Sequence, residues 1–343
     1  MAGQDIIVVG ASAGGVETLV RRVADLPDDL PAAVFIVLHM APRTGTALPR
    51  ILGRQTKLAV DHPFDGEEIR PNRIYVAVPD CHLIVNPGTV RVTTGPKENG
   101  HRPAVDTLFR SAAARYGPRV VGVVLSGTRD DGTAGLRTIH ARGGTAVVQD
   151  PDDAAFPGMP QSALARDHPD FVVPVGEMGA LLSKLARDGL PQEGRSAAMP
   201  DALDAELGWA HLDVDGPAPA DPPLGSPSGF TCPECHGGLW EIDDGTLPRY
   251  RCRVGHGFSA ESLFANQRTD VESAVWTAYR ALEERAALCR RLADRAQVRH
   301  AGISAQHFRV EADDVARQAS VLRALLLSGS DTGERSVSEG SEE

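Results

Sequence analysis

The chain has 343 residues, of which 42% are hydrophobic, a formal net charge of -11 and five cysteines. This length predicts at least two domains, and the hydrophobic content is sufficient for a sizeable core. The negative charge argues against nucleic acids and anionic membrane surfaces as partners, because both attract basic proteins. No apolar run approaches the length of a membrane span, and the first residues lack a signal-peptide pattern, so we expect no membrane insertion.

Residues 1–190 alternate strand-like and helix-like segments. The expected strands are 5–9, 33–38, 73–78, 119–125, 144–148 and 171–175, and helical patterns occur at 15–25, 103–116 and 132–142. Several of these runs are apolar throughout, as parallel strands covered on both faces are. We predict an α/β fold, a doubly wound and mostly parallel sheet. Short strands between Pro, Asn and Gly turns at about 58–95 predict a small antiparallel excursion.

The remainder of the chain divides by composition. We expect a Pro/Gly-rich linker at 191–229 with an amphipathic piece at 202–212, a zinc-ribbon-like segment at 230–265, a helical hairpin at 266–328 and a disordered acidic tail at 329–343. The linker is rich in Pro, Gly and Ser at 216–229, and the tail is polar throughout.

A glycine-rich turn follows the first expected strand, in the segment IIVVGASAGGVETLV at residues 6–20. Three interpretations of this turn are open. A dinucleotide-binding loop requires a second glycine where Ser12 stands, so the pattern fits it poorly. A nucleophile elbow fits Gly10-Ala-Ser12-Ala-Gly14, because glycines permit the strained turn that exposes a serine hydroxyl above a sheet. The third interpretation is a plain turn in which Ser12 caps the following helix.

A serine nucleophile requires a general base and an acid that orients the base. The second apolar run ends in His39, and the run at 119–125 leads into a turn with Asp130 and Asp131. Each of these has a plain structural explanation, as a buried histidine or as polar loop residues. Parallel strands bring their carboxyl ends to one edge of a sheet, so the three ends together predict a Ser–His–Asp triad. Its chain order differs from that of the α/β-hydrolases, which indicates another α/β scaffold.

These motifs resemble the catalytic domain of the chemotaxis-type protein-glutamate methylesterases (CheB-like). The resemblance covers residues 5 to about 187 and rests on IIVVGASAGGVETL, IVLHMAP, RIYVAVPDCHL, HRPAVDTLF and VVLSGTRDDGTAGL. It implies an enzyme that hydrolyses methyl esters on chemoreceptor glutamates, releasing methanol, and in many members also deamidates glutamines. The family's serine, histidine and aspartate match Ser12, His39 and Asp131, and the resemblance implies no cofactor for catalysis.

The resemblance also implies that backbone N–H groups near Ala13 and at Thr128 hold the oxyanion. The family reads Gly-Met-Gly-Asn-Asp-Gly where this chain reads GTRDDG at 127–132. A backbone donor survives a change from Met to Thr, whereas Arg129 and Asp130 add bulk and charge beside the site. Well-studied members carry an N-terminal receiver domain that is controlled by a phosphorelay. Because the catalytic segment here begins at residue 5, we expect control from a separate response regulator, a chemosensory kinase or the C-terminal half.

The cysteines near residue 240 have the spacing of metal ligands. Cys232 and Cys235 form a C-x2-C pair, and sixteen residues later Cys252 and His256 form C-x3-H. Tetrahedral zinc takes four ligands of these types from paired knuckles. His236 is an alternative fourth ligand, although its position directly after Cys235 makes the geometry awkward. Since protein fills all four positions, we predict a closed, structural zinc site.

Two apolar stripes predict that the C-terminal helices pair. The stripes are Val275, Tyr279, Leu282, Ala286 and Cys289 in the first helix, and Phe308, Ala312, Val315, Ala319, Leu322 and Leu326 in the second. The segment HAGIS at 300–304 supplies the turn of a hairpin. The stripes indicate packing within the hairpin or pairing between chains, so a homodimer through these helices is one prediction.

The expected partners are methyl-accepting chemotaxis proteins. The expected compartment is the cytoplasm, because the cysteines fit a metal site better than a disulfide framework. Two other functions stay open: a non-catalytic chemosensory scaffold, and a serine esterase acting on a small-molecule ester. An intact triad argues against the scaffold. Pocket shape decides the substrate of an esterase, so the sequence leaves the second alternative open.

Overall fold

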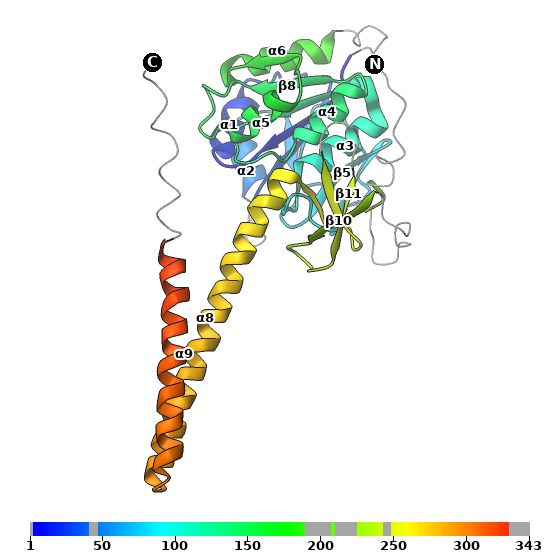
Figure 1. Ribbon diagram of the computed structural model, residues 1–343. Coiled ribbons are helices and arrows are strands. Elements are labelled where there is room, and N and C mark those ends of the chain that lie inside the picture. Colours follow the sequence, from blue (N-terminus) through cyan, green and yellow to red (C-terminus); the bar gives the residue numbers. More distant parts are fainter. Residues whose placement is uncertain (1–2, 41–46, 189–206, 210–224, 243–247, 329–343) are drawn as a thin grey trace, which may run out of the picture. The chain divides into compact units, whose positions relative to one another are not determined.

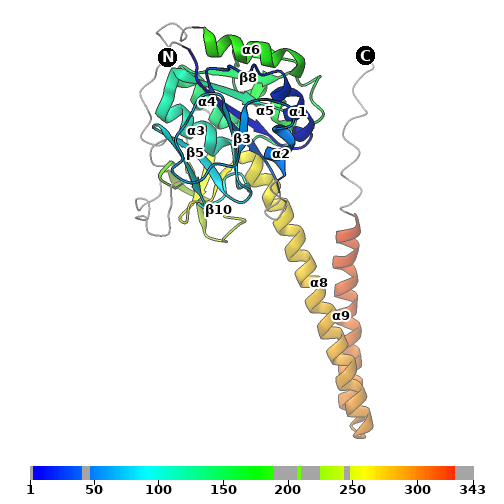
Figure 2. The ribbon, with the colours of Figure 1, turned by 180° about the vertical axis from the view of Figure 1, so that it is seen from behind.

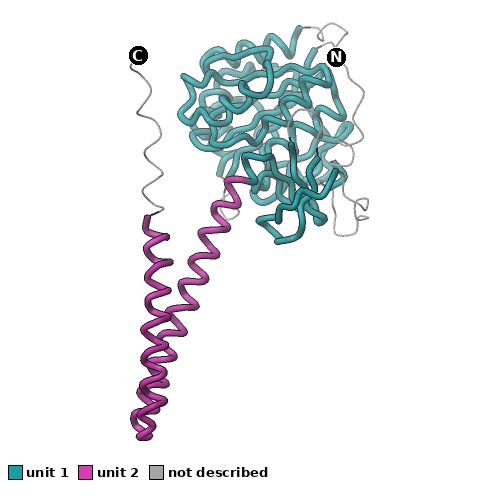
Figure 3. The backbone as a smooth tube through the Cα atoms, in the orientation of Figure 1, with its two compact units in different colours: residues 1–263 teal, residues 264–343 magenta. Residues whose placement is uncertain are grey.

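In the computed structural model, the described residues are 3–40, 47–188, 207–209, 225–242 and 248–328. The chain divides into two compact units, residues 1–263 and 264–343 (Figure 3). The tail predicted at 329–343 lies outside the described residues, as do residues 191–206 and 210–224 of the predicted linker. The first unit contains the expected α/β domain and the cysteine-rich segment.

Seven strands form the central sheet of the first unit (Figure 1). In spatial order they are β3 (Ala59–Asp61), β4 (Arg73–Val76), β2 (Ala33–Leu38), β1 (Ile6–Ala11), β7 (Val120–Val124), β8 (Thr145–Gln149) and β9 (Phe171–Val173). Every pair of neighbours is parallel. Strands β1, β2, β7 and β8 are buried along their whole length, as strands covered on both faces are. The predicted fold class is confirmed.

Helices cover both faces of this sheet, as the views in Figures 1 and 2 show. One face packs against α1 (Gly15–Ala24), α2 (Leu48–Leu52) and α6 (Val175–Arg187), and the other against α3 (Val105–Tyr116), α4 (Thr133–Ala141) and α5 (Gly158–Arg166). Side chains of β1 alternate between the two clusters, because successive residues of a strand point to opposite faces. Ile6 and Val8 belong to one cluster and Ile7 and Val9 to the other.

The antiparallel excursion is narrower than predicted. It consists of the hairpin of β5 (His82–Asn86) and β6 (Thr89–Thr93), which forms a separate two-stranded sheet. Strands β3 and β4, which also lie within the predicted stretch, are parallel members of the central sheet. Tyr75 of β4 shows the reason: it is fully buried and stacks on Phe35 of β2, with ring centroids 5.0 Å apart.

The cysteine-rich segment forms a four-stranded antiparallel sheet, which we call the ribbon. Its strands, in spatial order, are β10 (Ser226–Thr231), β11 (Gly238–Ile242), β12 (Arg249–Cys252) and β13 (Gly257–Ser259). Strand β10 begins inside the expected linker, because pairing with β11 outweighs a Pro/Gly-rich composition. The buried core of the ribbon is small and consists of Cys232, Leu239, Cys252, Phe258 and Leu263.

Two long helices follow, α8 (Ala260–Val298) and α9 (Gly302–Ser328). Helix α8 begins earlier than predicted, because Ser259 Oγ accepts from Ser262 N at 2.9 Å and so caps its first turn. In the second unit, Ala312, Val315 and Ala319 of the expected stripe are buried. Among the helices that the structure describes, none is both long and apolar enough to cross a membrane.

Candidate active site and metal centre

The first two expected catalytic residues follow strands that lie side by side. Ala11 of β1 is paired with Leu38 of β2, and His39 N donates to Ala11 O at 3.1 Å. On the other side of β1, Ser12 N donates to Ser126 O at 3.0 Å, just beyond the end of β7. Because these strands are parallel, their carboxyl ends meet at one edge of the sheet. Ser12 and His39 therefore leave the sheet as neighbours.

The turn that carries Ser12 connects β1 to helix α1. Helix α1 begins at Gly15, its N-cap is Gly14 at φ 69°, and no side chain caps it. Ser12 is therefore not the helix cap, and the plain-capping interpretation is wrong. Within the described residues the Ser12 hydroxyl makes no hydrogen bond. The hydroxyl stands near the N-terminus of α1, where partial positive charge favours a developing oxyanion.

His39 and Asp131 form a buried pair. His39 Nε2 lies 2.7 Å from Asp131 Oδ2, and the two side chains are only 6% and 2% exposed. A carboxylate accepts hydrogen bonds, so Nε2 is the nitrogen that donates to Asp131, and in the uncharged tautomer Nδ1 keeps its lone pair. His39 Nδ1 is buried and has no partner among the described residues. Nδ1 is thus the ring nitrogen that is free to accept a proton.

Asp131 stays ionised although it is buried. Burial alone would raise the pKa of Asp131, but hydrogen bonds and positive charge, those of His39 above all, hold it well below its usual range. Its Oδ2 also accepts from Val105 N at 2.7 Å, and its Oδ1 from Asp106 N at 3.2 Å, both in the first turn of α3. The N-terminus of a helix stabilises negative charge, so α3 holds the carboxylate that orients His39.

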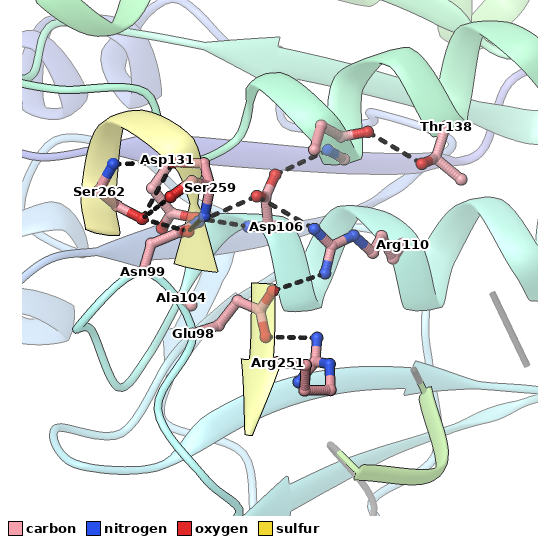
Figure 4. Close-up of polar contacts among 12 residues, drawn as sticks. Glu98, Asn99, Ala104, Asp106, Arg110, Asp131, Thr138, Arg251, Ser259 and Ser262 are labelled. Carbon is pink, nitrogen blue, oxygen red and sulfur yellow. Dashed lines mark hydrogen bonds and ion pairs between the residues drawn. The ribbon is translucent and has the colours of Figure 1, made fainter. Parts of the chain in front are cut away.

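Sequence reasoning missed Asn99, which is the side-chain amide that contacts Asp131 (Figure 4). Asn99 Nδ2 donates to Asp131 Oδ1 at 2.8 Å and to Asp106 Oδ2 at 3.0 Å. The residue is 2% exposed and has a left-handed backbone at φ 55°. An asparagine before a buried helix is only a weak sequence signal of a site residue, because asparagine also adopts the left-handed conformation in ordinary turns.

His101, the first residue of the segment HRPAVDTLF, is a second residue of the site that sequence reasoning missed. Its ring stacks on that of His39, with centroids 3.8 Å apart and an interplanar angle of 8°. Burial, together with the neighbouring charge of His39, lowers the pKa of His101 to about 4. His101 is therefore neutral at physiological pH and presents an uncharged ring face to the imidazole of His39.

The two expected oxyanion donors are free to act. Neither Ala13 N–H nor Thr128 N–H donates a hydrogen bond within the described ranges. Both lie close to Ser12. Ala13 is the next residue in the chain. Thr128 follows Gly127, which approaches Ser12 so closely that a Cβ added at 127 would lie 2.8 Å from the Ser12 Cβ. Glycine at 127 is thus required for this close approach. The arrangement leaves two backbone donors beside the reacting hydroxyl.

The two charged residues before Asp131 have different environments. Arg129 is exposed, with a left-handed backbone at φ 66°. Asp130 is only 3% exposed, and burial raises its pKa to about 6 in spite of a hydrogen bond with Ser259. Asp130 is thus buried near the start of α8, and at neutral pH a carboxyl with this pKa is still mostly ionised.

A groove of about 360 Å³ opens beside His39 and His101. Its charged lining residues are already paired: Arg102 Nη2 lies 2.8 Å from Asp80 Oδ1, and Lys97 Nζ lies 3.0 Å from Glu234 Oε1 of the ribbon.

The four expected metal ligands converge in the ribbon. The ligand atoms of Cys232, Cys235, Cys252 and His256 all lie within 4.8 Å of one another. Cys235 Sγ lies 3.7 Å from Cys252 Sγ, and His256 Nδ1 lies 3.6 Å from Cys252 Sγ. Tetrahedral zinc with bonds of about 2.3 Å to sulfur separates its ligands by ~3.8 Å, so the group fits such an ion. The sulfur atoms are too far apart for disulfides. His236 is exposed and is not a member of this group.

The comparisons with known proteins agree with the fold and the site. The model of the CheB methylesterase family matches residues 7–182, about half of the chain. The crystal structure of the Thermotoga maritima CheB methylesterase catalytic domain superposes with a TM-score of 0.51 at 33% identity, covering 54% of this chain and all of that one. Fold and strand-edge site thus define a CheB-type catalytic domain, and the chain belongs to the CheB methylesterase family.

Two curated relatives show how far the similarity extends. A protein-glutamate methylesterase/protein-glutamine glutaminase from Methanosarcina mazei is 34% identical over 192 residues, which cover 54% of this chain and 52% of the relative. A putative protein of the same name from Leptospira interrogans is 33% identical and is covered over 98% of its length. The chain therefore spans about half the length of some relatives and nearly all of others.

Proposed function

We propose that this protein is a serine-type protein-glutamate methylesterase acting on methyl-accepting chemotaxis proteins, and that it also deamidates glutamines. The observation that carries the proposal is the His39–Asp131 pair, which leaves His39 Nδ1 without a partner at the strand edge where Ser12 stands. Membership in the CheB methylesterase family and the names of the curated relatives support it.

The geometry assigns a role to each residue. Ser12 Oγ attacks the ester carbonyl while His39 Nδ1 takes its proton and later returns a proton to methanol. Asp131 keeps the proton on Nε2 and stabilises the imidazolium that forms. Water then hydrolyses the glutamyl-serine ester by the same proton transfers in reverse, and Ala13 N–H and Thr128 N–H stabilise the oxyanion in both steps.

The ribbon would hold zinc through Cys232, Cys235, Cys252 and His256, where the ion supplies structure. All five cysteines are free, which fits a reducing compartment such as the cytoplasm. Control by a separate response regulator or kinase, and dimerisation through α8 and α9, stay predictions. Light scattering of the full chain, beside a chain ending at residue 263, tests the second.

Methanol release from methylated chemoreceptor fragments tests the proposal. We expect Ser12→Ala to lower turnover by roughly four to six orders of magnitude and His39→Ala by a similar factor. His140→Ala is the matched control, because His140 Nδ1 also faces a carboxylate, Asp167 Oδ1 at 3.2 Å, away from the strand edge. The control should retain activity. Release that survives Ser12→Ala would refute the triad, and hydrolysis of an aryl ester alone would favour a small-molecule esterase.

If wild-type protein binds receptor fragments but hydrolyses neither ester, the scaffold alternative is correct. Glutamine deamidation is measured separately, as ammonia released from unmethylated receptor.

A further inference from the structure

The short segment Lys97–Asn99 connects the ribbon to the catalytic aspartate. Its backbone extends the ribbon as an extra strand: Asn99 N donates to Gly257 O at 2.8 Å, and Gly257 N donates to Lys97 O at 3.1 Å. Glu98 and Gly257 form a parallel bridge. The loop that reaches Asp131 is thus held at the edge of β13.

The side chain of Asn99 is fully hydrogen-bonded. Its Nδ2 donates to Asp131 and Asp106, and its Oδ1 accepts from Ser259 N at 2.8 Å and from Ser262 Oγ at 3.0 Å (Figure 4). The amide has one orientation, because carboxylates only accept hydrogen bonds and a backbone N–H only donates them. The amide nitrogen of Asn99 therefore holds the Asp131 carboxylate, and its oxygen is held by Ser259 and Ser262 at the end of the ribbon.

A buried ion network fixes the same segment a second time. Glu98 Oε2 accepts from Arg251 Nη2 of β12 at 2.8 Å, and Glu98 Oε1 accepts from Arg110 Nη1 of α3 at 2.9 Å. Burial opposes the negative charge, but the two guanidinium groups prevail and lower the pKa of Glu98 to about 2. Arg110 in turn contacts Asp106, at 3.3 Å. A charged chain thus leads from β12 to the helix that holds Asp131.

The metal ligands are adjacent in sequence to these contacts. Cys252 follows Arg251, and His256 precedes Gly257. Cys252 N donates to His256 O at 3.0 Å, which closes the turn between β12 and β13. Among the described residues, the ribbon's own apolar core has five members, and metal binding commonly stabilises folds with so small a core.

We propose that metal bound by Cys232, Cys235, Cys252 and His256 keeps the ribbon in the form that holds Asn99 against Asp131, so that the ribbon completes the active site and its occupancy sets esterase competence. Asn99 is then a positioning residue that acts through Asp131. The proposal deepens the methylesterase function and rests on it. A loss of the Asn99 contact frees the carboxylate to move, and small displacements of a catalytic group reduce rates strongly.

The first experiment removes and restores the metal in the full chain. Zinc content is measured by mass spectrometry, activity by methanol release, and the triad by the downfield NMR signal of the His39 Nε2–H proton, which requires no turnover. We expect about one zinc per chain, a fall in kcat of about 100-fold on chelation with little change in KM, loss of the signal, and recovery of all three with Zn²⁺.

The second experiment separates positioning from general folding. Asn99→Ala should lower kcat by about 100-fold with zinc still bound, and should shift or broaden the His39 signal. Ser262→Ala should have a smaller effect, because Ser259 N still donates to Asn99 Oδ1. Ser228→Ala is the matched control, since its hydroxyl contacts Leu239 O within the ribbon and does not reach Asn99.

The results distinguish failure of this proposal from failure of the proposed function. Metal-free protein with unchanged kcat and an unchanged His39 signal would overturn the coupling, as would a chain that binds no zinc. An equal loss in Ser228→Ala and Ser262→Ala would also overturn it. If zinc-loaded Ser12→Ala hydrolyses the ester like the wild type, the assignment of Ser12 as nucleophile fails, and the metal dependence of the NMR signal still decides the coupling.

Discussion

The central sheet and the ribbon are stabilised in different ways. The sheet is buried between two large apolar clusters, one on each face, and its inner strands are apolar throughout. The ribbon has a small apolar core. Its four candidate metal ligands are close in sequence to the residues through which it contacts the α/β domain. Hydrophobic burial therefore suffices for the α/β domain, whereas the ribbon has buried ion pairs and a group of four residues that could hold a metal ion.

This difference bears on the active site, because Asp131 receives hydrogen bonds from both kinds of structure. Val105 N and Asp106 N belong to the α/β domain, while Asn99 is shared with the ribbon. A perturbation of the sheet core should therefore unfold the domain with or without metal. A perturbation at the ribbon contact should alter the site and leave the sheet intact.

The largest effect on stability is expected from the sheet core. Phe35→Ala removes a fully buried ring that stacks on Tyr75, and should lower the free energy of unfolding by about 3–5 kcal/mol. Far-UV circular dichroism during denaturant unfolding measures it. The loss should be equal with and without a chelator. A loss seen only in chelated protein would contradict the independence of the sheet.

The junction between the sheet and the ribbon should make the free energy of unfolding depend on pH. The pKa of His101 falls from 6.5 to about 4 on folding. Between these values the unfolded chain binds a proton that the folded chain does not, so the free energy of unfolding decreases as the pH is lowered. The loss amounts to ~3 kcal/mol across this window. His101→Phe keeps a stacked ring that cannot bind a proton, so the slope of the unfolding free energy against pH should decrease by the contribution of one proton. An unchanged slope would refute this assignment.

At the ribbon contact, Arg251→Met leaves Glu98 with Arg110 as its remaining cation. We expect a local cost of about 1–3 kcal/mol, seen as ~10- to 100-fold faster hydrogen exchange at Gly257 N and Asn99 N, with β1 unchanged. The exposed Arg268 provides the control through Arg268→Met. Faster exchange throughout β1 would show that the ribbon supports the sheet as well.

The smallest effect is expected in the second unit. Arg285 of α8 lies 2.5 Å from Glu311 of α9, but the arginine side chain is 63% exposed. Exposed ion pairs add little, so Arg285→Ala should leave the melting of the helices unchanged. Val315→Asp, which places a charge in the buried stripe, should lower the melting temperature. Equal melting of the two variants would show that the stripe does not hold these helices.

Much of the fold could be read from local patterns. The strands followed from β-branched runs, and the turn after the first strand from the glycines around Ser12. His39 and Asp131 could be placed because parallel strands bring their ends to one edge. The metal ligands followed from knuckle spacing, whereas the start of β10 was missed because strand pairing outweighed a linker-like composition.

The sequence by itself determined which residues could form a triad and a metal site, since both depend on short-range spacing and on strand order. Tertiary structure alone decided that His39 uses Nε2 toward Asp131, and that Asn99 joins the two sites. Asn99 and Ser262 are 163 residues apart, and Glu98 and Arg251 are 153 apart. Such contacts leave no periodic pattern in a single sequence, because they arise only when separately folded surfaces pack together.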